Sequence, residues 1–252
     1  MYLTSKNMQK IIISGTSSGL GSELTKKLSK DYYIICFSRK INILKKKFSR
    51  NKNVEFYKVD LTNINNLEKF LRKITKIHPD IAGLINNAAL MYKGNIIEMN
   101  IDKVYQNYKV NVLSPILIMK YILKVMQKNG YGRIVNITSG APLNCFPGYS
   151  IYSSTKSSLN SISITASKEF KNKNITINLL SPGPIKTKMT SGMKAKFFTM
   201  SQSVKDIKKL ISRKNKINGK FIWRGKIIPL FPELKGINWL KGKATKNIKK
   251  YK

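Results

Sequence analysis

The feature that most constrains the fold is a regular alternation of two hydrophobic patterns along most of the chain. Short apolar runs alternate with longer segments in which apolar residues recur at helical spacing. The short runs predict strands over residues 10–14, 32–37, 54–59, 81–85, 132–138 and 175–180, and the longer segments predict helices over residues 19–30, 64–77, 101–126 and 152–170. Because short connections between such elements require right-handed crossovers, we expect a doubly wound α/β fold with a parallel sheet covered on both faces.

The chain is expected to form a single domain over residues 1–252, because no interior stretch resembles a linker and no internal repeat is found. Ligands of such sheets bind at the carboxyl ends of the strands, near the point where the strand order reverses. Residues 235–252 are expected to form a basic tail.

The net charge of +37 raises the question of nucleic-acid binding. Lys and Arg together number 48 against 11 acidic residues, but only 6 of the 48 are Arg. Arginine is the residue that suits phosphate recognition better, because its planar fork pairs with two oxygens at once. We therefore interpret most of the charge as a compositional bias on solvated faces, and no specific nucleic-acid partner is expected.

The scarcity of cysteine and histidine excludes several kinds of site. Two cysteines exclude a disulfide framework, and the single histidine, His78, excludes a multi-histidine metal centre. His78 precedes Pro79 and is expected to be a loop residue at a helix exit.

No apolar run is long enough to span a bilayer, and residues 1–10 lack the apolar core of a secretory signal, so we expect a cytoplasmic location. Aromatic residues in the basic tail allow weak contact with a membrane surface, although a frayed tail is favoured.

A glycine-rich turn, G-x-x-x-G-x-G over residues 15–21, lies between the first strand and the first helix. Gly15 permits a sharp turn, Gly19 removes a side chain that would block a pyrophosphate, and Gly21 lets the helix pack closely on the sheet. The helix N-terminus then presents N–H groups and a partial positive charge to the phosphates. The turn predicts a dinucleotide-binding domain of the Rossmann type.

The end of the second strand bears on which dinucleotide is bound. NAD-binding units usually carry an acid there for the ribose 2′-hydroxyl, whereas this chain reads Ser38, Arg39 and Lys40. A guanidinium suits a 2′-phosphate, which a carboxylate would repel. The residues therefore favour NADP over NAD.

Four polar residues complete a catalytic pattern. Tyr152 and Lys156 are four residues apart and share a helix face, while Ser139 follows the fifth strand and Asn111 lies within the long helical segment. Together with the glycine-rich turn, these residues resemble the short-chain dehydrogenase/reductase family in its compact form. Other matching segments are Asp60-Leu61, Asn86-Asn87-Ala88-Ala89 and Ser181–Thr187, so the resemblance covers residues 9–190.

The resemblance implies hydride transfer between NADP(H) and a carbonyl or alcohol. Tyr152 would give its proton to the substrate oxygen, and Lys156 together with the positive nicotinamide ring would lower the pKa of Tyr152. Lys156 would also hold the nicotinamide ribose. Ser139 would orient the substrate oxygen. Asn111 would kink its helix and hold a water that relays protons to Lys156.

The resemblance also implies a set of cofactor-binding residues. Asp60 would contact the adenine, Asn87 and Ala88 the adenosine ribose, and residues 182–187 would close over the nicotinamide. Ala89 stands where relatives usually have glycine, and we expect its methyl group to be tolerated. The full set is Gly15, Ser17, Ser18, Gly19, Leu20, Gly21, Ser38, Arg39, Asp60, Leu61, Asn87, Ala88, Ala89, Tyr152, Lys156, Pro182, Gly183, Ile185 and Thr187.

The resemblance weakens after Thr187, where residues 219–232 differ from the usual ending of the family. The resemblance implies a substrate lid over residues 188–200. An apolar wall over the substrate is one interpretation of its residues Met189, Met193, Phe197 and Phe198, and ordinary packing of the lid is the other. More specific roles that stay open are reduction of a 3-oxoacyl group on a carrier and reduction of a keto-sugar nucleotide. A non-catalytic dinucleotide-binding or nucleic-acid-binding protein is the alternative of another class.

Relatives pair through their long helices, so a homodimer or homotetramer is expected through residues 101–126 and 152–170.

Overall fold

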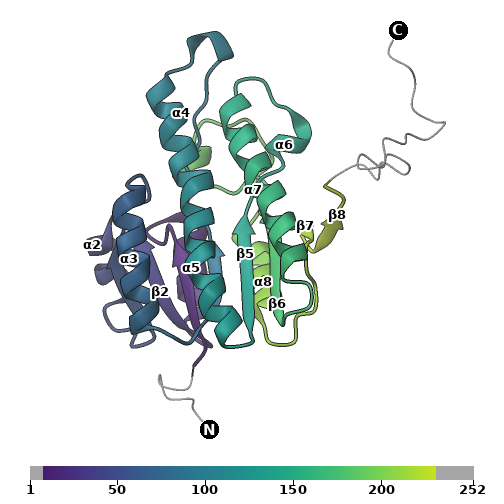
Figure 1. The fold of residues 1–252 in the computed structure, drawn as a ribbon. Coiled ribbons are helices and arrows are strands. Elements are labelled where there is room, and N and C mark those ends of the chain that lie inside the picture. Colours follow the sequence, from purple (N-terminus) through teal and green to yellow (C-terminus); the bar gives the residue numbers. More distant parts are fainter. Residues whose placement is uncertain (1–7, 231–252) are drawn as a thin grey trace, which may run out of the picture.

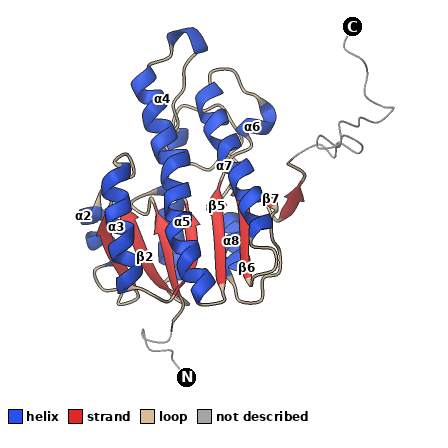
Figure 2. Cartoon of the chain, in the orientation of Figure 1, coloured by secondary structure: helices blue, strands red, loops and turns tan. Residues whose placement is uncertain are grey.

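The computed structural model describes residues 8–230, which form a three-layer α/β structure with helices on both faces of one sheet (Figures 1 and 2). The strand order among these residues is β3-β2-β1-β4-β5-β6-β7-β8. All neighbouring strands are parallel except the last pair, β7 and β8. The doubly wound parallel sheet expected from the sequence is therefore confirmed.

The strands are β1 (Lys10–Ser14), β2 (Tyr33–Ser38), β3 (Val54–Lys58), β4 (Ile81–Asn86), β5 (Gly132–Ile137), β6 (Ile175–Ser181), β7 (Phe221–Trp223) and β8 (Lys226–Ile228). The helices are α1 (Gly19–Leu28), α2 (Ile41–Phe48), α3 (Ile64–Ile77), α4 (Ile101–Tyr108), α5 (Ser114–Lys128), α6 (Ala141–Asn144), α7 (Ser150–Glu169) and α8 (Met200–Ile211). Short 3₁₀ turns cover Ile96–Glu98 and Lys188–Thr190.

Two hydrophobic cores fill the space between the layers. Ile11 and Ile13 of β1 pack toward α1, α2 and α8, while Ile12 points the other way, toward α3 and α5. This division follows from the two-residue period of a strand, whose successive side chains point to opposite faces. Both faces of β1 are buried, which explains why its sequence is continuously apolar.

The strand order places a crevice at the carboxyl end of the sheet. β1 pairs with β2 on one side and with β4 on the other. The connection after β1 leads outward to β2, while the connection after β4 leads in the opposite direction, to β5. The loops after these two strands separate at this point, which is where open α/β sheets bind ligands.

The helix expected over residues 101–126 is not uniform. α4 ends at Tyr108, a π-helical turn covers Lys109–Leu113, and α5 continues to Lys128. Contrary to the expectation that no run could span a bilayer, Ile101–Lys128 contains a window long and apolar enough to do so by composition, but 61% of it is buried inside the molecule. Packing against α3, α7 and the sheet accounts for its hydropathy.

His78 follows the end of α3, as expected, but it is a buried residue. It is only 6% exposed, and its Nε2 lies 3.3 Å from both the Glu55 carboxylate and the Tyr57 hydroxyl. Burial lowers the pKa of His78, and the nearby Glu55 charge opposes that effect. His78 therefore belongs to a polar cluster that joins α3 to β3, away from the crevice.

Candidate active site

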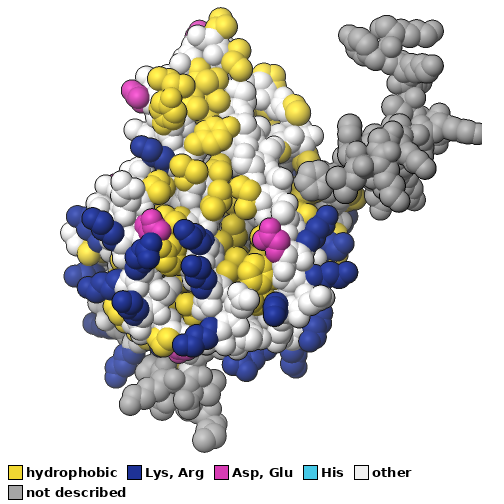
Figure 3. Space-filling view, viewed as in Figure 1, with side chains coloured by type: hydrophobic (Ala, Val, Ile, Leu, Met, Phe, Trp, Pro, Cys, Tyr) yellow, Lys and Arg dark blue, Asp and Glu magenta, His cyan; other side chains and the backbone are white. Residues whose placement is uncertain are grey.

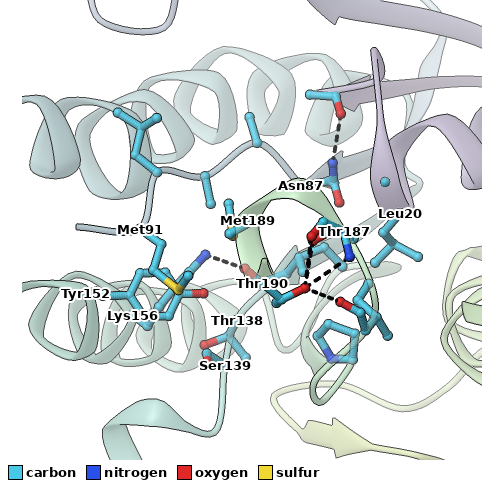
Figure 4. A pocket seen from close by; sticks show the side chains of 18 of the residues that line it. Leu20, Asn87, Met91, Thr138, Ser139, Tyr152, Lys156, Thr187, Met189 and Thr190 are labelled. Carbon is cyan, nitrogen blue, oxygen red and sulfur yellow. Dashed lines mark hydrogen bonds between the residues drawn. The ribbon is translucent and has the colours of Figure 1, made fainter. Parts of the chain in front are cut away.

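A cleft of about 1220 Å³ occupies the crevice at the carboxyl ends of the strands (Figure 4). Its walls come from the glycine-rich turn and from the segments that follow β2, β3, β4, β5 and β6. Every residue proposed above for catalysis or cofactor binding lines this cleft except Gly21 and Asn111. Figure 4 shows Tyr152, Lys156 and Ser139 toward one end and Leu20 and Asn87 toward the other.

The glycine-rich turn is shaped to admit a pyrophosphate. Gly15 has a φ of +73°, and a Cβ there would lie 2.8 Å from Ala88 Cα. A side chain at Gly21 would overlap the Gly15 carbonyl, so Gly21 serves helix packing behind the cleft. Ser18 precedes α1 without forming a side-chain cap, which leaves the first-turn N–H groups available to an anion. These observations fit a dinucleotide phosphate at this end.

Asn87 has a structural task that the sequence did not indicate. Its Nδ2 donates to the carbonyls of Ser14 and Gly15, at 3.0 and 3.2 Å. The Ser14 hydroxyl accepts in return from the backbone N–H groups of Asn87 and Ala88. These bonds fix the end of β4 against the turn after β1, so Asn87 shapes the cleft as well as lining it.

Cations dominate the end of the cleft beside β2 and β3. Arg39 lines it together with Asp60. Partial burial raises the pKa of Asp60, but hydrogen bonds from Thr62 and the charge of Arg39 outweigh it, so the pKa is lowered overall. A hollow of about 400 Å³ adjoins Arg39, and all the ionisable residues that line it are cations: Arg39, Lys40 and Lys58.

Tyr152 and Lys156 are both buried on α7, with 8% and 2% of their surface exposed. The Lys156 amine donates to the Ile137 carbonyl at 2.8 Å and lies 5.8 Å from the centre of the Tyr152 ring. Burial lowers the pKa of Lys156 to about 8. The pair therefore sits at the junction of β5 and α7, facing the cleft.

Burial raises the pKa of Tyr152 to about 12 in the chain alone, whereas the lowering expected from Lys156 and the nicotinamide ring concerns the complex with coenzyme. Burial disfavours the phenolate, and a hydrogen bond with Ser139 opposes this effect without cancelling it. The Lys156 amine is committed to the Ile137 carbonyl. In this state Tyr152 is a protonated phenol, the form that a proton donor requires.

Ser139 lies in the loop after β5, and its hydroxyl oxygen accepts from the Ala141 backbone N–H at 3.1 Å. Accepting this bond orients the oxygen and leaves the hydroxyl hydrogen available for donation. Ser139 lines the same cleft as Tyr152.

Asn111 lies in the π-helical turn and is fully buried behind the cleft. Its Oδ1 accepts from the Leu90 N–H at 2.8 Å, and its Nδ2 donates to the Leu90 carbonyl and to Thr155 Oγ1. Thr155 in turn donates to the Tyr152 carbonyl. The expected local distortion of the helix is present as the π-helical turn, and both amide hydrogens are used, so the side chain positions Leu90 and α7.

Residues 188–200 divide between the two interpretations, an apolar wall and ordinary packing. Met189 and Met193 line the cleft, whereas Phe197 and Phe198 do not. Phe198 is held away from it, because its N–H donates to the Pro184 carbonyl at 2.7 Å and the Arg224 guanidinium stacks 4.0 Å from its ring. Arg224 and Gly225 both have positive φ and form the tight turn between β7 and β8. In the sequence, the Arg-Gly pair between two apolar runs was the feature that could have predicted this turn.

Several lining residues were not predicted from the sequence. They belong to the loops after β4 and β5, which have no regular spacing: Met91, Lys93, Leu143, Phe146 and Tyr149. Only their position next to Asn87 or between Ser139 and Tyr152 could have suggested them. The basic tail over 235–252 lies outside the described residues.

A glycine-rich phosphate cradle and a buried Tyr–Lys pair that share one cleft define a dinucleotide-dependent oxidoreductase. The short chain dehydrogenase family matches residues 9–196. The chain belongs to this family and is an oxidoreductase.

Individual relatives are about 28–31% identical to the chain over the residues that align. A 3-amino-tetrahydro-pyrrolizinone reductase from Xenorhabdus hominickii is 28% identical, covering 78% of this chain and 67% of the relative. A 3-oxoacyl-[acyl-carrier-protein] reductase from Buchnera aphidicola is 31% identical, covering 72% and 75% respectively. The structure of ElxO with NADP bound matches with a TM-score of 0.79 at 28% identity, covering 86% of this chain and 98% of ElxO.

Proposed function

We propose that the chain reduces a carbonyl compound with NADPH, or oxidises the corresponding alcohol with NADP, in the cleft described above. The observation that carries this proposal is the buried Tyr152–Lys156 pair with Ser139 in the wall of a cleft that begins at the glycine-rich turn. A bound nicotinamide supplies hydride chemistry. The glycine-rich turn and the first turn of α1 would hold the pyrophosphate, and Lys156 would hold the nicotinamide ribose.

Each catalytic side chain has a task that its environment suits. Reduction places negative charge on the substrate oxygen, so a proton donor must lie within hydrogen-bond reach. Tyr152 would donate the proton, since burial keeps its phenol protonated. Ser139 would donate a hydrogen bond to the same oxygen and orient it. Lys156 would then assist reprotonation of Tyr152, because burial brings its pKa to about 8, near neutral pH.

Support for NADP over NAD comes from Arg39. Its guanidinium lines the cleft at the end of β2, where a carboxylate would be expected for NAD, and the adjoining hollow carries only cations among its ionisable lining residues. ElxO, a relative in fold and at 28% identity, binds NADP, although a neighbour at 24% identity, 4-hydroxyisoleucine dehydrogenase, binds NADH.

Arg39→Asp is expected to reverse the coenzyme preference. The change removes a cation from the 2′-phosphate and adds a carboxylate that repels it, so the Kd for NADPH should rise at least tenfold while the Kd for NADH falls or stays the same. Fluorescence titration of the reduced coenzymes measures both constants. Arg50→Asp is the matched control, because Arg50 is exposed near the end of α2 and does not line the cleft. An unchanged preference in Arg39→Asp would show that Arg39 does not contact the coenzyme.

A carrier-bound 3-oxoacyl group is the more specific substrate that the relatives favour, since three of them at 29–31% identity are 3-oxoacyl-carrier reductases. The basic surface agrees with an acidic carrier. Reduction of a 3-oxoacyl thioester in the presence of NADPH tests this assignment, and a panel that includes keto-sugar nucleotides separates the two roles.

We also propose that the chain forms a homodimer through α4, α5 and α7. Figure 3 shows apolar side chains gathered over α4 and the upper part of α5, while Lys and Arg gather lower down around α3. Ile101, Tyr105 and Leu113 are 58%, 60% and 44% exposed on this face. Light scattering of the full chain should give the mass of two copies, and the mass of one copy would contradict the proposal.

A further inference from the structure

We infer that the substrate has an apolar body and an anionic group, a carboxylate or a phosphate, which Lys93 binds at the mouth of the cleft. This inference rests on the proposed function and adds the class of substrate to it. Three observations carry it: the apolar walls beside Tyr152, the charges at the rim, and the way in which Lys93 is held.

The walls beside Tyr152 are apolar and adaptable. Met91 comes from the loop after β4, Leu143 and Phe146 from the segment after β5, and Met189 and Met193 from the lid. Leu143, Phe146 and Met189 are exposed by 44%, 51% and 39% in spite of their hydrophobicity. Covering these exposed apolar surfaces with an apolar ligand is favourable in free energy, and flexible Met side chains adapt to the shape of the ligand.

The charges at this end of the cleft are all positive. Apart from the buried Lys156, the ionisable groups with a charge there are Lys93, Lys188 and Lys194. Within residues 8–230, the one carboxylate that lines the cleft is Asp60 at the coenzyme end, where Thr62 and Arg39 already satisfy it. Among the described lining residues, an anion at the rim therefore meets lysines and no unsatisfied carboxylate.

Lys93 is held in place more firmly than an ordinary surface lysine. Its amine lies 5.3 Å from the centre of the Tyr149 ring, a distance at which a cation and an aromatic face attract each other. Tyr149 packs edge-on against Phe146, and the Gly94 N–H donates to the Gly148 carbonyl at 3.0 Å, which ties the two loops together. Tyr149 precedes the first turn of α7 and lines the same cleft as Tyr152, so the contact holds the Lys93 amine against the segment that leads into this helix.

The test compares a substrate that carries the anion with a neutral partner of the same shape. The pairs are an alkyl ketone with a terminal carboxylate and its methyl ester, and a 3-oxoacyl thioester of phosphopantetheine and the same thioester of pantetheine. At low ionic strength the wild-type chain should reduce the anionic member of at least one pair with a kcat/KM about tenfold higher. The pair that shows the preference identifies the source of the anion as a free acid or a carrier arm.

Lys93→Met should reduce this preference about fivefold, the size expected of an ion pair at a partly exposed site, mainly through the KM of the anionic member. Lys93→Arg should retain most of the preference, and Lys216→Met, which removes an exposed lysine that does not line the cleft, should leave it unchanged. The KM for NADPH should stay the same in all three variants, because Lys93 lies at the substrate end.

Equal kcat/KM for both members of each pair in the wild-type chain would overturn the inference and leave the proposed function intact. An equal loss of preference in Lys93→Met and Lys216→Met would also overturn it, since it would assign the effect to net charge. If no member of either pair is reduced, while other carbonyl compounds are, the substrate class is wrong. If no carbonyl compound is reduced at all, the proposed function fails as well.

Discussion

Replacing Tyr152 with phenylalanine is expected to lower kcat for carbonyl reduction about a thousandfold while the Kd for NADPH stays within twofold. The change removes one hydroxyl from a residue that is 8% exposed and leaves its ring in place. Loss of a positioned proton donor costs about 10² to 10⁴ in rate. Absorbance of NADPH during turnover measures kcat, and fluorescence titration measures the Kd.

Tyr149→Phe is the control for this prediction. Tyr149 lines the same cleft and also carries a phenol, but its ring faces Lys93. Its kcat should stay within a few-fold of the wild-type value. A Tyr152→Phe variant that keeps more than a tenth of the wild-type kcat would exclude Tyr152 as the proton donor.

Lys156→Met is expected to lower kcat/KM at least a hundredfold and, at the same time, to change how stability depends on pH. Lys156 is 2% exposed, and burial lowers its pKa in the folded chain to about 8, against 10.5 in an unfolded chain. Between these two pKa values the unfolded chain binds a proton that the folded chain does not. The free energy of unfolding of the wild-type chain therefore decreases as the pH falls from 10.5 to 8.

The contribution of Lys156 is the difference between the two chains. Wild-type stability minus Lys156→Met stability should fall by about 3 kcal/mol over this range and stay constant below pH 8. Urea denaturation at a series of pH values measures it. Lys168→Met provides the control, because Lys168 is exposed on the same helix and does not line the cleft. A pH-independent difference between wild type and Lys156→Met would mean that Lys156 titrates normally in the folded chain.

The fold was predictable because its main strands are buried on both faces and its main helices are buried along one side. The strand over residues 10–14 has the predicted bounds, and the helix over residues 64–77 does as well. In both, a single hydrophobic period dominates the local sequence. The position of the glycine-rich turn between β1 and α1 followed from the same pattern, because the three glycines fall between a predicted strand and a predicted helix.

Features that depend on contacts between distant segments could not be predicted. The burial of His78 depends on Glu55 and Tyr57 of a neighbouring strand. The tasks of Asn87 and Asn111 depend on which backbone groups lie opposite their amides, which no spacing encodes. The raised pKa of Tyr152 is a consequence of burial that becomes visible only when the packing around α7 is known.

The measurement that tests the central proposal most directly is isotope transfer from NADPH deuterated at the reactive position of the nicotinamide, across a panel of ketones, 3-oxoacyl thioesters and keto-sugar nucleotides. With the wild-type chain, deuterium should appear on the former carbonyl carbon of at least one product. With Tyr152→Phe, the rate of its appearance should fall about a thousandfold. Deuterium in no product, from a chain that nevertheless binds NADPH, would contradict an oxidoreductase acting on these carbonyl classes through Tyr152.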